Sequence, residues 1–511
     1  MNDRLSVIIP AGNEALSIGN VIREARRLGP FEIIAVVNGS SDGTAAVCRS
    51  MGCRVAEYGF ALGHDVGRGI GACLAEGDIL LFLDADIPIP ADRLAPFVQA
   101  IRAGCDIALN QMSRSLALSE IPHYTAAAKT AFNRMLGRPE LSVNSLVAVP
   151  HAMSRKAAET IGFEHLANPC LAQAIASAKG MRFACPAEVD VIGANRPRKA
   201  HIERCEGSVY PRSTTRILGD HLEALGWLIR RYGPRGGLPE GARDRGFLRH
   251  YAPPPARGKA KRSAVIPAME ENRTILPAIR SVRAAGVDEI IVVANGADDA
   301  TVAAAMTAGA RVMVFSRPLG HNVGRAIGAA CATGDVCLFV DGDFALPPRN
   351  LVPFLRAAEN GTDIALNDLA FLFRRFRPAD PISTVKYFLN VCLNRPELLN
   401  NSLTAVPHAM TRGAIARLGW ETLVIPPLAQ AKAVLEGLSV RAVHSVDVVA
   451  PNRVREDHKA VGRRIPAFER IVGDHLEAVD YLLKRKGERG GFRDTERDRD
   501  MITAMKGRIR T

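Results

Sequence analysis

The stretch that decides the fold is GDILLFLDADIPIP at residues 77–90. Its uninterrupted apolar run, ILLFL, is typical of a strand buried on both faces of a parallel sheet. The run leads directly into Asp84 and Asp86, and a spacing of two residues places both side chains on the same side of an extended backbone. Two carboxylates at a strand end can hold Mg²⁺ or Mn²⁺ against substrate phosphates. The open alternative is an acidic turn that caps the next helix.

The same stretch recurs as GDVCLFVDGD at 334–343, which places Asp341 and Asp343 in the same context. One constant shift also relates SVIIPAGNE (6–14) to SAVIPAMEE (263–271), EIIAVVN (32–38) to EIIVVAN (289–295), and LGHDVGRGIGA (62–72) to LGHNVGRAIGA (319–329). A repeat this long exceeds a solenoid unit, so we expect two tandem domains of one fold, at 1–252 and 263–511. The proline-rich and then basic segment at 253–262 is predicted to be an exposed linker.

Helical patterns such as IGNVIREARRLG (18–29) lie between the strand-like runs, and Gly29 and Gly52 stand where helices would end. This alternation predicts an open, Rossmann-like α/β sheet with ligands at the carboxyl ends of its strands. The loops NGSSDGT (38–44) and DAD (84–86) should lie there. Amphipathic patterns at 219–233 and 473–487 predict a helical extension in each repeat, packed on the core or, alternatively, contacting a membrane surface or a second chain.

The composition is that of an ordinary folded protein, with 47% hydrophobic and 23% charged residues, which excludes collagen-like and mostly disordered classes. A net charge of +13 favours anionic partners, but an aromatic content of 5% argues against a nucleic-acid reader. The ten cysteines form no C-x-x-C pair, which fits reduced thiols in a cytoplasmic protein. No export signal or membrane-spanning run is visible, so we expect any membrane contact to be peripheral.

Two further motifs could bind phosphate or metal. LGHDVGRGIGA surrounds Arg68 with glycines, which let backbone approach a ligand, and an arginine fork matches phosphate; a plain glycine-rich turn is the alternative. NRPRKAH (195–201) and NRVREDH (452–458) place a histidine among arginines, either as a solvated basic loop or as a nitrogen ligand beside phosphate-binding cations. His151 and His408, in the PHAM segments, either shape an acceptor pocket or are buried and hydrogen-bonded.

In this order, SVIIPAGNE, NGSSDGT, the GRG turn and FLDAD resemble family 2 glycosyltransferases of the GT-A fold. The run from GRGIGA through DAD, RPEL (138–141) and the later histidine is similar to glucosyl-3-phosphoglycerate synthase and its relatives. The resemblance covers residues 5–205 and 262–460. It implies two tandem GT-A domains, each with a C-terminal helical extension, and metal-dependent transfer of a sugar from a nucleotide-diphosphate donor. The charge excess suggests an anionic or phosphorylated acceptor.

The resemblance also implies roles for individual residues. Pro10, Ala11 and Glu14 would line the nucleotide pocket, and Asn38 would contact the base. Arg68 would bind the diphosphate, and Asp84 would contact the ribose or the sugar. Mg²⁺ or Mn²⁺ would be bound by Asp86, with His201 as a possible further ligand. The second repeat offers Pro267, Glu271, Asn295, Arg325 and Asp341, with Asp343 and His458 at the metal. The family carries Asp at the two Asn positions and the synthases carry Lys at the two Arg positions, so the donor base stays open.

Because both repeats keep these residues, we expect two working sites that depend on Asp86, Asp343, Arg68 and Arg325. Two alternatives remain at this point. A sugar-phosphate nucleotidyltransferase uses a related sheet with metal-binding carboxylates, although PAGNEALS (10–17) lacks its glycine-rich opening. A non-catalytic binding module for an anionic polymer would also fit the basic charge.

Overall fold

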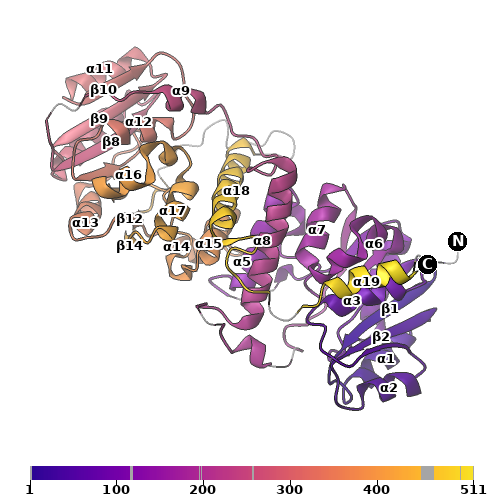
Figure 1. Cartoon of the computed structure of the whole chain (residues 1–511). Coiled ribbons are helices and arrows are strands. Elements are labelled where there is room, and N and C mark those ends of the chain that lie inside the picture. The colour runs from indigo at the N-terminus through magenta and orange to yellow at the C-terminus, as the bar shows by residue number, and fades with distance from the viewer. Residues whose placement is uncertain are drawn as a thin grey trace. The chain divides into compact units, whose positions relative to one another are not determined.

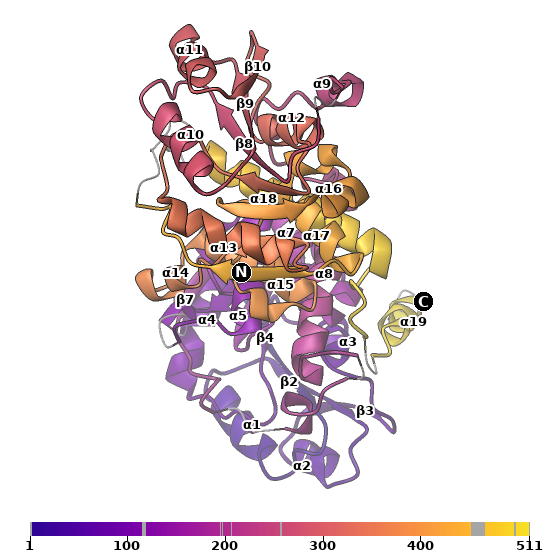
Figure 2. The ribbon, with the colours of Figure 1, turned by 90° about the vertical axis from the view of Figure 1, so that its left-hand side faces the viewer.

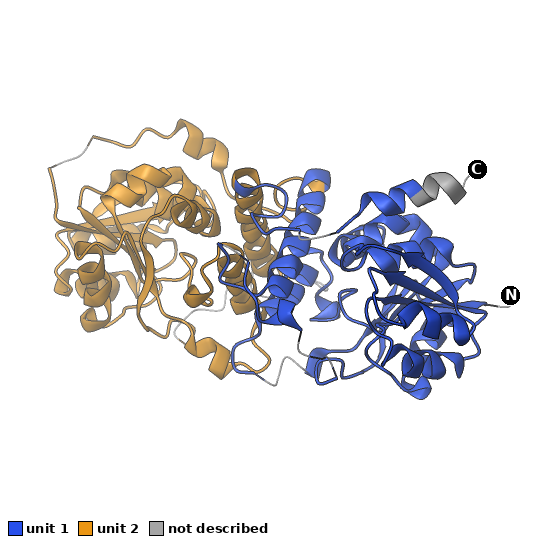
Figure 3. Cartoon of the chain, turned by 60° about the horizontal axis from the view of Figure 1, so that its bottom comes forward, with its two compact units in different colours: residues 1–231, 486–511 blue, residues 232–485 orange. Residues whose placement is uncertain are grey.

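The computed structural model describes residues 3–114, 119–194, 196, 198–205, 207–255, 258–450, 465–494 and 497–509. The chain forms two compact units, coloured separately in Figure 3. Unit 1 comprises residues 1–231 and 486–511, and unit 2 comprises residues 232–485. These boundaries differ from those expected from the repeat, because residues 232–252 group with unit 2 and residues 486–511 group with unit 1. The linker expected at 253–262 is also shorter in the structure, because Arg262 is already the first residue of a strand.

A seven-stranded sheet forms the centre of each unit (Figure 1). In unit 1 the spatial order is β3-β2-β1-β4-β6-β5-β7. The bounds are β1 Leu5–Ala11, β2 Glu32–Asn38, β3 Arg54–Tyr58, β4 Ile79–Phe82, β5 Ile107–Asn110, β6 His151–Ser154 and β7 Phe183–Ala187. Unit 2 repeats this order with β8 Arg262–Ala268, β9 Glu289–Asn295, β10 Arg311–Phe315, β11 Val336–Phe339, β12 Ile364–Asn367, β13 His408–Thr411 and β14 Val440–His444.

The sheets are mixed rather than fully parallel. β6 runs antiparallel to both β4 and β5, and β13 does the same between β11 and β12, while the other strand pairs are parallel. The antiparallel strand is the HAMS or HAMT part of the PHAM segment, which the sequence did not identify as a strand. With only four residues, it is too short for a recognisable period.

Helices cover both faces of each sheet. Those of unit 1 are α1 Ile18–Arg26, α2 Thr44–Ser50, α3 Val66–Leu74, α4 Ala91–Arg102, α5 Tyr124–Met135, α6 Arg155–Ile161, α7 Pro169–Ala178, α8 Arg212–Tyr232 and α19 Asp500–Ile509. Its short 3₁₀ segments are η2 Pro139–Leu141, η3 Phe163–Ala167 and η4 Lys199–His201. Gly29 and Gly52, which follow α1 and α2, have positive φ, as expected for residues that end helices.

The helices of unit 2 are α9 Arg245–His250, α10 Ile275–Ala284, α11 Asp299–Thr307, α12 Val323–Cys331, α13 Pro348–Glu359, α14 Phe371–Arg375, α15 Pro381–Cys392, α16 Arg412–Leu418, α17 Pro426–Leu435 and α18 Pro466–Lys486, with η5 Pro396–Leu398 and η6 Trp420–Val424. They are counterparts of the helices of unit 1, but α9, which corresponds to α19, comes first in the chain order, and α14 has no counterpart among the described helices of unit 1. Figure 2 shows α10 and α11 on one side of β8 and β9, and α12 on the other. No described helix is apolar enough to cross a membrane, including the 21-residue α8 and α18.

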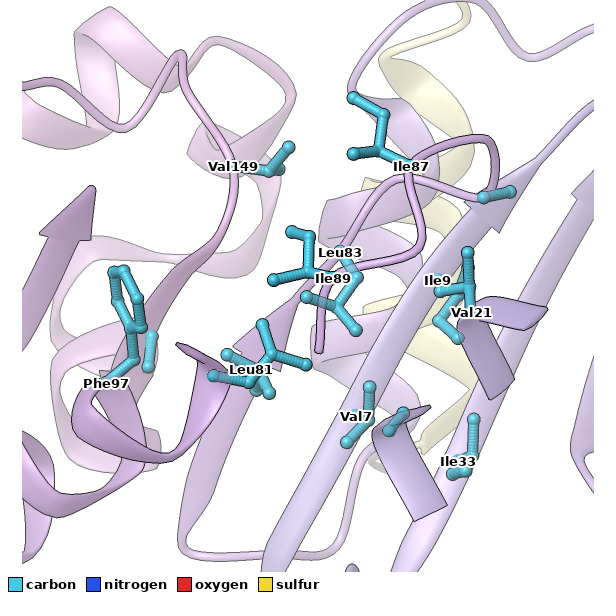
Figure 4. Close-up of a cluster of buried hydrophobic side chains, with 14 of the residues drawn as sticks. Val7, Ile9, Val21, Ile33, Leu81, Leu83, Ile87, Ile89, Phe97 and Val149 are labelled. Carbon is cyan, nitrogen blue, oxygen red and sulfur yellow. The ribbon is translucent and has the colours of Figure 1, made fainter. Parts of the chain in front are cut away.

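Alternate residues of the central strands enter opposite cores. Val7 and Ile9 of β1 and Leu81 of β4 pack with α1 and α4 (Figure 4), whereas Ile8 and Phe82 pack against the face covered by α3 and α6. This two-sided burial explains why the strands read as continuous apolar runs. The strand order changes direction between β1 and β4, so their carboxyl ends border the crevice where α/β sheets bind ligands.

Candidate active site

A cavity of about 880 Å³ opens in unit 1 at the carboxyl ends of β1, β2 and β4. It lies at the point where the strand order reverses, as the sheet topology predicts. The site residues predicted for the first repeat all line it, namely Pro10, Ala11, Glu14, Asn38, Arg68, Asp84, Asp86 and His201. The structure therefore brings together five motifs that are spread over almost 200 residues of sequence.

Helix α3 brings Arg68 to this cavity. It begins after Asp65, which has a left-handed backbone with φ of 66°. A Cβ on Gly67 would lie 2.9 Å from Pro10 Cβ, and one on Gly71 would collide with the side chain of Ile8. Gly67 and Gly71 therefore let α3 pack closely against β1. Gly63 and Gly67 also line the cavity, and the expected approach of their backbone to a ligand stays a prediction.

Arg68 is buried and ion-paired on both sides. Its Nη1 lies 2.9 Å from Asp65 Oδ1, and its Nη2 lies 3.3 Å from Asp84 Oδ1. Burial alone would lower the pKa of Arg68, but the two carboxylates outweigh it and raise this pKa. Burial raises the pKa of Asp84, and the nearby charge of Asp86 adds to that shift while Arg68 opposes it. The guanidinium is thus a fixed cation beside the paired aspartates.

The second carboxylate of the motif has a different partner. Asp86 is buried, and its Oδ2 accepts a 2.5 Å hydrogen bond from Nη2 of Arg198, which also donates to Glu14 Oε1 at 2.9 Å. Burial lowers the pKa of Arg198, and the bonds to Asp86 and the charge of Glu14 raise it by more. Arg198 belongs to the NRPRKAH run, whose arginines were expected near phosphate without this one being singled out.

The donor set fits a divalent ion that is held mainly through a substrate. Asp84 and Asp86 supply two hard oxygen ligands in one cavity, and Mg²⁺ is commonly bound by one or two carboxylates plus substrate phosphates. His201 lines the same cavity from η4, and its Nδ1 accepts from the Arg198 N–H at 3.3 Å. Within the described ranges, no group of three or more His, Cys, Asp or Glu side chains is arranged to hold a metal by itself.

Asn38 connects two backbone segments at the edge of the cavity. Its Nδ2 donates to the carbonyl of Ala11 at 3.2 Å, and its Oδ1 accepts from the N–H of Leu62 at 3.2 Å. Asn295 bonds the Leu319 N–H and the Gly320 carbonyl in unit 2. The base contact implied for these asparagines stays a prediction, while their bonds to the loop before Arg68 and Arg325 are clear.

Two cations in the cavity were not identified from the sequence. Lys129 of α5 and Arg216 of α8 both line it, and neither has a carboxylate within 4.0 Å among the described residues. Burial lowers the pKa of both side chains. The one available signal was that lysine recurs at the same place in the second repeat, as Lys386, whose pKa burial lowers to about 8.

The PHAM histidines are structural. His151 is buried, stacks on Phe82 at 4.9 Å between ring centroids, and hydrogen-bonds the Ala148 carbonyl through Nδ1 at 2.9 Å. Burial, together with the nearby Arg68, lowers its pKa to about 3. His408 repeats this arrangement on Phe339. Of the two interpretations of these histidines, the buried and hydrogen-bonded one is therefore correct.

Unit 2 preserves part of the arrangement. Arg325 is buried and pairs with Asp341 at 2.8 Å, but Asn322 occupies the position of Asp65. Pro267 is the second-last residue of β8, as Pro10 is of β1, and Glu271 is buried like Glu14. Asp343 follows β11 as Asp86 follows β4. His458 lies outside the described residues.

Comparisons with known proteins identify a family and several similar proteins. The model of Glycosyl transferase family 2 matches residues 6–162 and 263–384, together more than half of the chain. A dolichyl-phosphate hexose transferase of Haloferax volcanii is 28% identical over 135 residues, which cover 26% of this chain and 58% of that protein. A glucosyl-3-phosphoglycerate synthase of Mycolicibacterium paratuberculosis is 36% identical over 103 residues, which cover 18% of this chain and 31% of that protein.

The matches thus span less than two thirds of either curated relative. Among solved structures, glucosyl-3-phosphoglycerate synthase from Mycobacterium tuberculosis in complex with UDP is similar with 17% identity and a TM-score of 0.34, over 48% of this chain and 83% of that one. Mannosyl-3-phosphoglycerate synthase from Rubrobacter xylanophilus has 19% identity and a TM-score of 0.35, over 45% and 75%.

Proposed function

The chain belongs to glycosyl transferase family 2, and from that premise we propose that each unit is a metal-dependent GT-A domain that transfers a sugar from a nucleotide-diphosphate donor to an anionic acceptor. The observation that carries the proposal is the first cavity, where buried Arg68 lies between two carboxylates beside Asp86, at the reversal point of the sheet. The relatives' names support the donor class, since one is a hexose transferase and the other a glucosyl compound synthase.

The donor would bind with its diphosphate toward Arg68, Arg198 and the aspartate pair. Asp84 and Asp86 would hold Mg²⁺ or Mn²⁺, with His201 as a further ligand, and the ion would supply charge stabilisation at the diphosphate. When the bond between the anomeric carbon and the diphosphate oxygen breaks, negative charge grows on the leaving oxygen. Fixed cations lower the barrier to this step, and Arg68 is held in place before the reaction starts.

An anionic acceptor is supported by the two cavity cations that carry no ion pair among the described residues. Burial removes part of the hydration of Lys129 and Arg216. A bound phosphate or carboxylate group would compensate for this loss by accepting hydrogen bonds from them. Both curated relatives are named after a phosphate-bearing compound, dolichyl phosphate and glucosyl-3-phosphoglycerate. We propose a second working site in unit 2 because Arg325, Asp341 and Asp343 are retained there.

The test is release of nucleoside diphosphate from UDP-, GDP-, ADP- and CDP-sugars, with Mn²⁺ or Mg²⁺ and with phosphorylated or carboxylated acceptors. We expect one donor to be used, Asp86→Asn and Asp343→Asn each to remove the turnover of their own unit, and the double variant to be inactive. Asp78→Asn is the matched control, because Asp78 is exposed at the other end of the same strand. Full turnover by the double variant would refute the proposal.

A further inference from the structure

The segments that follow the two long helices are exchanged between the repeats. Residues 486–511 belong to the second repeat in sequence but to unit 1 in space, and residues 232–252 show the reverse exchange. In unit 1, Arg489 pairs with Asp220 at 2.8 Å and with Glu223 at 2.7 Å, and Arg497 pairs with Asp220 at 2.5 Å. Arg499 also pairs with Glu223, at 2.5 Å. These three arginines hold the exchanged segment on α8.

Unit 2 contains the equivalent contacts. Arg235 pairs with Asp474 at 2.8 Å and with Glu477 at 2.6 Å, Arg243 pairs with Asp474 at 2.6 Å, and Arg245 pairs with Glu477 at 2.6 Å. The acceptors are the Asp and Glu of the GDHLEA motif that both long helices carry. Because every contact recurs at the equivalent position, the exchange is a property of both repeats rather than of one chain end.

The exchanged segment also touches the loop and helix that carry Arg68. The N–H of Asp498 donates at 2.8 Å to the carbonyl of Leu62, the first residue of the LGHDVGR turn. Ile502 of α19 is fully buried, and a Cβ on Gly69 would lie 2.6 Å from its Cδ1. Figure 1 shows α19, in yellow, beside α3. The segment thus contacts the arginine turn both before and after Arg68.

Arg497 fixes this segment from inside the protein. Its guanidinium is fully buried, and besides Asp220 it donates to the Ala167 carbonyl at 2.6 Å through Nη1 and pairs with Asp494 at 2.7 Å. The charge of Arg497 also acts on Asp65, the ion-pair partner of Arg68. Burial raises the pKa of Asp65, but His64, Arg68, Arg216 and Arg497 together outweigh it and lower this pKa. Asp65 therefore stays ionised, as its ion pair with Arg68 requires.

We propose that Arg497 is a positioning residue for the site in unit 1, where it holds the segment 497–502 against residues 62–69 and so fixes Arg68. Arg243 has the same role in unit 2, where the Asp244 N–H donates to Leu319 O at 2.8 Å and buried Leu248 packs in the core with α12. Each site then depends on a segment supplied by the other repeat. The proposal rests on the proposed function only where it concerns catalysis.

The first experiment needs no substrate. Hydrogen exchange is followed in the full chain at residues 62–74 and 319–331, whose peptides differ in mass. Arg497→Ala should speed exchange at 62–74 about tenfold and leave 319–331 unchanged, because local stability is lost where the segment docks. Arg243→Ala, the matched control, should show the opposite pattern. Faster hydrogen exchange at 319–331 in Arg497→Ala, or no change in either peptide, would contradict the docking of residues 486–511 in unit 1.

The second experiment separates positioning from mere stability. In an Asp343→Asn background, which leaves only the first site, Arg497→Ala should lower kcat roughly tenfold or more while the donor KM changes less than about threefold. Arg497→Lys should recover part of kcat. Arg499→Ala is the control, since Arg499 holds the same segment through Glu223 but is not among the main groups that lower the pKa of Asp65.

An equal kcat loss in Arg497→Ala and Arg499→Ala would overturn the positioning role, as would an unchanged kcat in Arg497→Ala. Folding of Arg497→Ala is expected because Asp220 retains Arg489 as its partner. If the unaltered chain shows no sugar transfer, the proposed function and the kinetic role of Arg497 are both wrong. The hydrogen-exchange experiment still decides in which unit the segment docks.

Discussion

Arg68→Met tests how the buried ion-pair network supports unit 1. The substitution keeps an extended apolar side chain but leaves Asp65 and Asp84 without the guanidinium between them. Asp84 is 39% exposed, so solvent screens its charge and its contribution is small. Asp65 is only 8% exposed, and a buried charge that loses its partner typically costs about 3–5 kcal/mol. Arg216 and Arg497 still act on Asp65, so we expect the lower end, about 3 kcal/mol.

The chain offers a direct assay because it has two tryptophans, one per unit. Trp227 in α8 packs against a core of unit 1, and Trp420 in η6 packs in unit 2. In a Trp420→Phe background, urea unfolding followed by the fluorescence of Trp227 reports on unit 1. With a slope of about 2 kcal/mol per M, a loss of about 3 kcal/mol lowers the unfolding midpoint by roughly 1.5 M.

Two variants complete the experiment. Asp65→Asn added to Arg68→Met should recover most of the lost stability, because it removes the unpaired charge and reproduces the asparagine found at 322. Arg325→Met, followed by Trp420 in a Trp227→Phe background, should cost only about 1 kcal/mol, since Arg325 pairs with Asp341 alone among the described residues. A midpoint shift below about 0.3 M for Arg68→Met, or no recovery on adding Asp65→Asn, would refute this reasoning.

Three further predictions concern the stability of the units. Burial lowers the pKa of His151 and His408 to about 3 and of His221 and His475 to about 4, whereas unfolded histidines titrate near 6.5. Below pH 6.5 these histidines therefore bind protons in the unfolded chain but stay neutral in the folded chain. Each histidine should lower the free energy of unfolding by about 1.4 kcal/mol per pH unit down to about pH 4. Equal urea midpoints at pH 7 and 5 would contradict this. Gly71→Val should destabilise unit 1 by about 1–3 kcal/mol through collision with Ile8, while Gly59→Ala, in open space, should be neutral in the Trp227 assay. Asn168→Ile should cost about 1 kcal/mol in that assay, because Asn168 Oδ1 caps α7 by accepting from the N–H groups of Cys170 and Leu171, and an unchanged midpoint would argue against the cap.

Much of the fold could be predicted because its signals are local. The continuous apolar runs predicted β1, β2 and β4, and the paired aspartates at the end of β4 marked the ligand-binding edge. Parallel strands bring their carboxyl ends to one edge, so the amino-acid pattern alone was enough to place Asn38 and Asp84 together, whereas Pro10 was assigned to the site through the family resemblance. The antiparallel β6 could not be predicted, since four residues carry no clear period.

The remaining site residues depend on contacts between distant elements. Lys129 and Arg216 reach the cavity from α5 and α8, and no motif connects them to the aspartates in sequence. Asp65 lies three residues before Arg68, but its role as a buried partner depends on how α3 docks. The exchange of the segment 486–511 leaves no trace in the repeat pattern, because equivalent segments can dock on either copy of one fold.

The central claim, that Asp84 and Asp86 hold a divalent ion against a donor diphosphate beside Arg68, is tested most directly by a crystal structure with Mn²⁺ and the nucleoside diphosphate that the enzyme releases. We predict a manganese anomalous peak within about 2.5 Å of a carboxylate oxygen of Asp86, with the diphosphate between that ion and Arg68. The same features are expected at Asp343 and Arg325. A diphosphate bound elsewhere, or a cavity that stays empty at saturating nucleotide and Mn²⁺, would contradict the account.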